Sequence, residues 1–184
     1  MIAVSSRLVL VYSLGAVLSV TAIASAYAQG LQWAIVNFKV RHDFPTVRRI
    51  DSQQLAQWLG DSHRVQPALL DVRTKEEYDV SHIHGAQRIE PGASAASTAI
   101  PREKPIVTYC SVGYRSAAFA KALQDSGFKD VQNLTGSIFD WANKGFPIER
   151  QGQPVKKVHP YNDRWGSLLK KELRANVPPV DAGI

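Results

Sequence analysis

The chain has 184 residues and a formal net charge of +6 at pH 7, with 45% hydrophobic and 21% charged residues. This composition excludes a disordered or collagen-like chain, and the single cysteine excludes an intramolecular disulfide and a zinc module built from cysteines. The basic residues are scattered and do not alternate with aromatic residues, so the charge predicts a surface that favours small anions and not nucleic acid.

An uncharged segment separates Arg7 from Lys39, and residues 8–20 within it are almost entirely apolar. The Ala-Tyr-Ala sequence directly before Gln29 fits the small-residue cleavage motif of a secretory signal peptide. We therefore expect residues 1–28 to be removed and the rest of the chain to be exported to the periplasm or an equivalent lumen.

A retained membrane anchor is the alternative interpretation of this segment. Residues 8–28 are long enough to cross a bilayer about 30 Å thick. Trp33 and Phe38 would then lie at the membrane interface. The charges on the two sides of the segment do not fix one orientation, so cleavage is the favoured outcome. Both interpretations place the domain beside or beyond a membrane.

Residues 46–150 alternate short β-branched runs with helical stretches, which is typical of a parallel α/β sheet. The expected elements are, in chain order, a strand at Val47–Ile50, a helix at Ser52–Leu59, a strand at Ala68–Val72, a helix at Thr74–Tyr78, strands at Ala86–Ile89 and Ile106–Tyr109, a helix at Ser116–Ser126, a strand at Val131–Leu134 and a helix at Ser137–Lys144. Thr74 and Glu77 form the start signal of a capping box, and Gly127 and Gly145 stop the last two helices. We therefore predict a single α/β domain with about five parallel strands and helices on both faces.

Residues 151–184 form a C-terminal extension of different composition. One helical patch is expected within it, at Trp165–Arg174. The large apolar residues of this patch fall near helical spacing: Trp165, Leu168, Leu169 and Leu173. The patch is therefore expected to lay one apolar face on the domain or on a partner, and packing on the domain is the favoured outcome.

The most informative stretch places Cys110 between an apolar strand and a helix that begins near Arg115 or Ser116. The carboxyl ends of strands in an open α/β sheet form the ligand crevice, and the N–H groups at a helix start attract anions. Gly113 allows the loop to curl so that successive backbone N–H groups converge on one small target. The helix start and the Arg115 cation are expected to lower the pKa of the Cys110 thiol. Cys110 is therefore a candidate nucleophile rather than a small buried hydrophobic residue.

Three stretches of the chain resemble the signatures of the rhodanese family. Residues 69–89 resemble its amino-terminal signature, residues 109–116 its active-site loop, and residues 134–148 its carboxyl-terminal signature. The resemblance extends over nearly all of residues 46–150 and implies a rhodanese-like fold. The sequence departs from the family pattern outside the active-site loop, at Ser81, His84 and Ser137.

The resemblance implies a thiosulfate sulfurtransferase that works by double displacement, with Cys110 and Arg115 as the catalytic residues. The Cys110 thiolate would attack the outer sulfur of a donor such as thiosulfate, release sulfite and hold the sulfur as a persulfide. A thiol or cyanide would then accept that sulfur. The loop N–H groups would stabilise the persulfide, and Arg115 would also bind the donor. No metal or organic cofactor is expected, and the expected substrate-binding residues are Ser111, Val112, Gly113, Tyr114 and Arg115.

Two other functions stay open from the sequence. Related phosphatases and arsenate reductases place the arginine one residue further from the cysteine, whereas Arg115 is the fifth residue after Cys110. The shorter loop favours a single terminal sulfur over a tetrahedral oxyanion, and thus sulfur transfer. A non-catalytic rhodanese-like module that binds a membrane or periplasmic partner is the second alternative, and the presence of Cys110 disfavours it.

Asp71 and Arg73 follow an expected strand and could reach the same sheet edge as Cys110, where they would support the site from behind. The favoured expectation is instead an exposed pair that fastens the turn, together with Glu77.

His82 and His84 have the spacing of metal ligands, but the sequence organises no further ligands around them. We therefore expect a turn histidine that is hydrogen-bonded to the backbone, and no metal.

Overall fold

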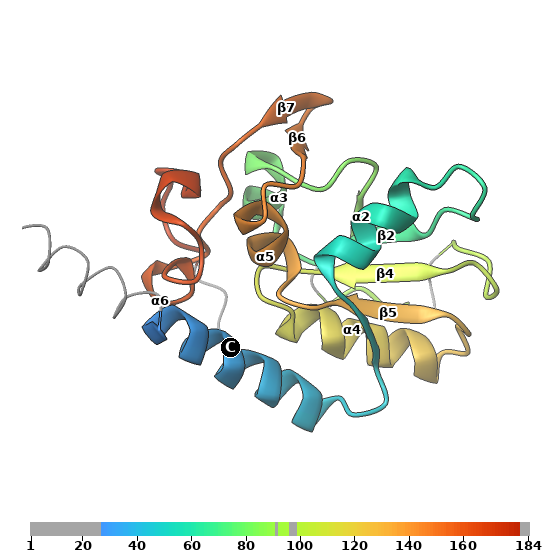
Figure 1. Ribbon diagram of the computed structural model, residues 1–184. Coiled ribbons are helices and arrows are strands. Elements are labelled where there is room, and N and C mark those ends of the chain that lie inside the picture. Colours follow the sequence, from blue (N-terminus) through green and yellow to red (C-terminus); the bar gives the residue numbers. More distant parts are fainter. Residues whose placement is uncertain (1–26, 91, 96–98, 181–184) are drawn as a thin grey trace, which may run out of the picture.

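The computed structural model describes residues 27–90, 92–95 and 99–180 (Figure 1). The expected signal peptide or anchor at residues 1–28 lies outside these residues except for its last two positions, so it stays a prediction. Within the described ranges, no helix is long and apolar enough to cross a membrane.

The centre of the fold is a parallel sheet of five strands in the order β1-β5-β4-β2-β3. The strands are β1 (Arg48–Ile50), β2 (Ala68–Asp71), β3 (Gln87–Arg88), β4 (Ile106–Tyr109) and β5 (Val131–Leu134). Each overlaps a predicted strand, so the prediction of a five-stranded parallel α/β sheet is confirmed. The strand β4 lies in the middle of the sheet, and the loop that leaves its carboxyl end therefore lies at the centre of the sheet edge.

Helices cover both faces of the sheet, as predicted. The helices of the domain are α2 (Ser52–Gly60), α3 (Lys75–Val80), α4 (Tyr114–Asp125) and α5 (Ser137–Asn143). Figure 1 shows α4 on one face and α2 and α5 on the other. The predicted capping box is present at the start of α3, where Thr74 and Glu77 bond to each other's backbone N–H groups. The helix α4 begins at Tyr114, slightly earlier than expected, because Gly113 in a left-handed conformation ends the loop there.

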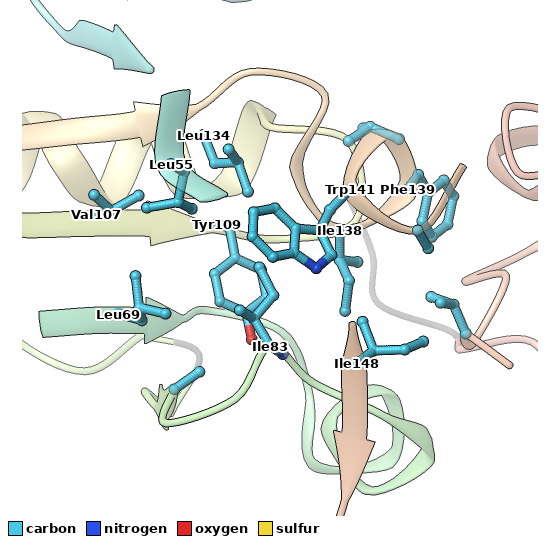
Figure 2. Close-up of a cluster of buried hydrophobic side chains, with 14 of the residues drawn as sticks. Leu55, Leu69, Ile83, Val107, Tyr109, Leu134, Ile138, Phe139, Trp141 and Ile148 are labelled. Carbon is cyan, nitrogen blue, oxygen red and sulfur yellow. Dashed lines mark hydrogen bonds between the residues drawn. The ribbon is translucent and has the colours of Figure 1, made fainter. Parts of the chain in front are cut away.

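The hydrophobic core lies on both sides of the sheet because the central strand is buried on both faces. Val107 and Tyr109 of β4 belong to the cluster that faces α2 and α5, where Figure 2 shows Tyr109 beside the indole of Trp141. Ile106 belongs to the second cluster, under α4. The strand therefore holds its carboxyl end in a fixed position.

A helix at residues 27–43 packs on the domain and was not predicted from the sequence. Val36 and Val40 on one of its faces are buried in the core. The opposite face exposes four large apolar side chains: Tyr27, Leu31, Ile35 and Phe38. The apolar composition of this helix continues that of the preceding segment, so the sequence pattern gave no sign of where the folded domain begins.

A hairpin of β6 (Ile148–Arg150) and β7 (Gln153–Val155) follows the sheet and was also not predicted. Its turn residues, Gln151 and Gly152, both have positive φ angles, 51° and 75°, as a tight two-residue hairpin requires. Backbone hydrogen bonds between Glu149 and His82 fasten the hairpin to the turn after α3.

The C-terminal extension packs on the domain, and Leu168 and Leu169 are buried in its core. The prediction of one helical patch at Trp165–Arg174 is wrong, because the chain forms the short helix α6 (Asp163–Gly166) and a separate 3₁₀ turn at Lys171–Leu173. Between these turns the Asn143 side chain at the end of α5 donates to the Leu168 carbonyl and accepts from the Lys170 N–H. These bonds replace the intrahelical bonds that a continuous helix would need.

Candidate active site

Cys110 lies directly after β4, with its side chain enclosed by the loop that connects this strand to α4. The residue is only 1% exposed. The Gly113 N–H donates a hydrogen bond to Cys110 Sγ at 3.1 Å, and Ser116 Oγ lies 3.6 Å from the same sulfur. Gly113 has a φ of 110°, which glycine adopts without strain and which turns its N–H toward the sulfur. The positive end of the α4 dipole also points at Sγ.

The first residues of α5 hold the backbone of this loop in place. The Cys110 N–H donates to Ser137 Oγ at 3.1 Å, and the Ile138 N–H donates to the Cys110 carbonyl at 3.2 Å. Ser137 is one of the positions that depart from the family pattern, and it has a positive φ of 50°. Its hydroxyl therefore contributes a loop contact that glycine at this position would lack.

Arg115 is fixed by a buried carboxylate that sequence reasoning did not assign to the site. Arg115 Nη1 and Nη2 donate to the two oxygens of Glu77, both at 2.9 Å. Ser111 Oγ donates to Glu77 at 2.5 Å, and Glu77 is fully buried. Two parallel hydrogen bonds between guanidinium and carboxylate also fix the orientation of the arginine. The sequence predicted for Glu77 a helix cap and a place beside Asp71 and Arg73, but not the contact with Arg115, which lies 38 residues away.

The charges around the sulfur favour its ionised form. Burial acts to raise the pKa of the Cys110 thiol, but the Arg115 charge and the hydrogen bonds from Ser116 and Gly113 outweigh it, and the pKa lies below its ordinary value. Burial likewise acts to raise the pKa of Glu77, but the hydrogen bond and charge of Arg115 lower it overall. Cys110, Arg115 and Glu77 thus form one cluster in which the Arg115 charge favours the ionised forms of the other two groups.

A small cavity of about 30 Å³ lies over the sulfur. Its lining residues are Cys110, Ser111, Val112, Tyr114, Arg115, Tyr161 and Trp165. The structure therefore brings the predicted loop residues together around one space, with Gly113 contributing its N–H to the sulfur. The last two lining residues belong to the C-terminal extension. Sequence reasoning did not place them at the site, since no local motif connects them to the loop.

Asp71 and Arg73 form a buried pair, so the favoured expectation of an exposed pair is wrong. Both side chains are 0% exposed, and Arg73 Nη2 lies 2.6 Å from Asp71 Oδ2. Arg73 Nη2 also donates to the Ser81 carbonyl at 2.6 Å, which ties the end of β2 to the end of α3. The pair affects the site indirectly. The positive charge of Arg73 contributes to lowering the pKa of Glu77, which in turn contacts Arg115.

The two histidines lie in a turn and are bonded to other protein groups. His82 stacks on the Tyr78 ring, and its Nδ1 lies 3.2 Å from the Tyr78 carbonyl, as expected for a turn histidine bonded to the backbone. His84 Nδ1 lies 2.6 Å from a Glu149 carboxylate oxygen. In the part of the chain that the structure describes, no group of three or more His, Cys, Asp or Glu side chains is arranged to hold a metal ion.

A larger groove of about 530 Å³ lies elsewhere, beside Ile83 and Trp141. None of its lining residues carries a thiol or a carboxylate, and the one imidazole, of His84, is paired with Glu149. The chemistry of the described residues is therefore concentrated at Cys110.

A model of the rhodanese-like domain family matches residues 51–144 of the 184 residues. The chain belongs to the rhodanese-like domain family. The match contains the strands β2 to β5, the loop of Cys110 and the Glu77 carboxylate, and it ends before the C-terminal extension.

Known relatives of this rhodanese-like domain include sulfurtransferases. A protein named sulfurtransferase from Allochromatium vinosum is 35% identical over 103 residues, which cover 55% of this chain and 94% of that protein. The probable adenylyltransferase/sulfurtransferase MoeZ of Mycobacterium tuberculosis is 35% identical over 101 residues, which cover 53% of this chain but only 25% of MoeZ. This chain thus corresponds to about a quarter of MoeZ.

Solved structures agree with the fold. The rhodanese-like domain of the Anabaena Alr3790 protein superimposes with a TM-score of 0.52 at 21% identity, over 74% of this chain and 89% of that domain. The prediction of a rhodanese-like fold is therefore confirmed.

Proposed function

We propose that this rhodanese-like domain is a sulfurtransferase that carries a sulfane sulfur as a persulfide on Cys110. The observation that supports it most directly is the buried thiol itself, whose pKa is lowered by Arg115 and by contacts from Gly113 and Ser116. A lower thiol pKa increases the fraction of Cys110 present as the nucleophilic thiolate. The sulfurtransferases among the relatives support the same chemistry.

The reaction has two displacements and no net oxidation or reduction. In the first, the Cys110 thiolate attacks the outer sulfur of thiosulfate, the sulfur–sulfur bond of the donor breaks, and sulfite leaves with the electron pair. In the second, a thiolate or cyanide attacks the outer sulfur of the persulfide and restores the Cys110 thiolate. The Gly113 N–H and the start of α4 stabilise negative charge on sulfur in both steps.

Arg115 contributes its positive charge and hydrogen-bond donors to the site. Its contacts with Glu77 and Ser111 use three of the five N–H groups of the guanidinium. Arg115 therefore stays the proposed group that binds the anionic donor, by its charge and its remaining N–H groups. Glu77 is a positioning residue, because it reaches the sulfur only through Arg115.

The length of the loop favours sulfur transfer over phosphoryl or arsenate chemistry. Arg115 is the fifth residue after Cys110, one residue closer than in the related phosphatases and arsenate reductases. Such a short loop, with the Gly113 N–H on the sulfur, matches a single terminal sulfur on Cys110.

Exposure to thiosulfate is expected to add one sulfur atom to the intact mass of the chain, and cyanide is expected to remove it. Because the chain contains one cysteine, the added sulfur is assigned to Cys110 without further mapping. Cys110→Ala should show no gain under the same conditions. An unmodified wild-type thiol, together with a partner that binds wild type and Cys110→Ala equally, would instead establish the non-catalytic binding module.

We also propose that the domain is exported, with cleavage before Gln29. The contacts of the helix at residues 27–43 support this position: Gln29 Nε2 donates to the Ser167 carbonyl at 3.1 Å, whereas Tyr27 and Ala28 are exposed. Cleavage there would remove no packed residue among those described. The intact mass of the mature protein should correspond to a chain that begins at Gln29. A chain that keeps residues 1–28 and is found in the membrane fraction would instead favour the membrane anchor.

A further inference from the structure

The C-terminal extension contributes part of the wall of the cavity over Cys110. Tyr161 and Trp165 line this cavity, yet both lie beyond the family match at residues 51–144. Tyr161 is 3% exposed and Trp165 is partly buried. Two aromatic rings from outside the matched domain thus lie beside the sulfur.

Tyr161 is held in place by contacts on several sides. Its ring lies against the Arg115 guanidinium, with 4.8 Å between the guanidinium carbon and the ring centroid. Its N–H donates to His159 Nδ1 at 2.9 Å, and its carbonyl accepts from the Val180 N–H at 2.8 Å. The φ of Tyr161 is 67°, a left-handed conformation that costs a non-glycine residue energy and persists only where its surroundings enforce it.

Trp165 is held by a short surface helix that is anchored on its far side. The Asn162 side chain caps α6 by accepting the Trp165 N–H at 3.0 Å. The chain then enters the core at Leu168 and Leu169. Capping and core packing thus fix Trp165 from both sides.

Tyr161 and Trp165 flank the approach to the sulfur. Cys110 is 1% exposed, and both rings line the small cavity beside it together with residues of the loop. A reagent that approaches Cys110 through this cavity therefore passes the two rings.

We propose that Tyr161 and Trp165 determine which donors and acceptors reach Cys110, and that they shield the persulfide between the two half-reactions. This inference builds on the proposed sulfur transfer but concerns access alone. A larger reagent needs a wider opening, so the two side chains select against bulky thiols more strongly than against small ones.

The test compares alkylation of Cys110 by iodoacetamide and by a bulky maleimide in the full chain, followed by intact mass. Trp165→Ala should increase the maleimide rate by about tenfold or more, and the iodoacetamide rate by a smaller factor, because removing the indole from the cavity wall gives more room to the larger reagent. Trp165→Phe keeps an aromatic ring and should give intermediate rates. Leu173→Ala, a matched change in the extension outside the cavity lining, should react at the wild-type rate.

Equal alkylation rates in wild type, Trp165→Phe and Trp165→Ala would overturn this proposal. Urea unfolding of each variant shows whether it is folded. If Trp165→Ala does not fold, the comparison of Trp165→Phe with wild type still tests the proposal. Alkylation needs no sulfur donor. If the chain gains sulfur from thiosulfate but the variants show no size-dependent alkylation, the access role is rejected and the proposed function is kept. If alkylation depends on reagent size but thiosulfate adds no sulfur, the access role is kept and the proposed function is rejected.

Discussion

Replacing Asp71 with alanine is expected to lower the free energy of unfolding by about 3 to 5 kcal/mol, the range for removing one partner of a buried ion pair. Asp71 and Arg73 are both 0% exposed. Asp71 accepts hydrogen bonds from Arg73 Nε and Nη2, so its removal leaves a guanidinium without a counter-charge inside the protein. Urea unfolding at neutral pH measures the change.

Asp79→Ala provides the matched control. Asp79 pairs with Lys75, but the two side chains are 51% and 67% exposed. Solvent screening limits such a pair to about 0 to 1 kcal/mol. If both alanine variants lowered the free energy of unfolding equally, the buried ion pair would contribute no more to stability than the exposed one, which contradicts the prediction. Asp71→Ala combined with Arg73→Met, which removes both charges, should recover part of the loss.

Replacing Arg115 with alanine is expected to slow sulfur transfer by about a hundredfold or more, the scale for removing a group that stabilises charge in an active site. Arg115 is the cation beside the thiolate, and it is also the partner of the buried Glu77. Its loss leaves Glu77 next to the site without its main counter-charge. Steady-state transfer from thiosulfate to cyanide measures the effect.

The pH dependence of Cys110 alkylation separates the electrostatic role of Arg115 from a loss of folding. Burial acts to raise the pKa of Cys110, and the Arg115 charge is the largest influence that lowers it. Because a nearby cation favours the charged thiolate, the rate in wild type should rise at a lower pH than that of an ordinary cysteine. In Arg115→Ala the rise should move to higher pH, and Arg115→Lys should lie between the two.

Arg48→Ala is the control for this experiment, because Arg48 forms an exposed ion pair with Asp130 away from the sulfur. Its pH profile should match that of wild type. An unshifted profile in Arg115→Ala would show that the guanidinium does not set the ionisation of the thiol.

The sheet and its helices could be predicted because their signals are local. The strand β4 is a short apolar run whose residues are all buried, and α3 begins with a capping box that involves Thr74 and Glu77. The helix at residues 27–43 could not be predicted from its composition, since the same apolar pattern also suits a leader or an anchor. The single helix expected at residues 165–174 is broken by the Asn143 side chain from α5, a contact that no local pattern encodes.

The same distinction applies to the site. Cys110, Gly113 and Arg115 lie within one loop and one helix start, so their proximity follows from the sequence. Glu77 comes from another helix, and Tyr161 comes from beyond the family match. Their places depend on how the chain folds back on itself. The sequence therefore located the proposed nucleophile, but not the carboxylate that positions Arg115 or the rings that line the cavity.

The single cysteine has a consequence for oxidative damage. With no second thiol in the chain, a sulfenic acid at Cys110 cannot be captured as an internal disulfide. Repair then depends on a reductant that arrives from outside, and further oxidation to the sulfinic acid would be permanent. The enclosure of this sulfur, at 1% exposure, slows peroxide before that first irreversible step.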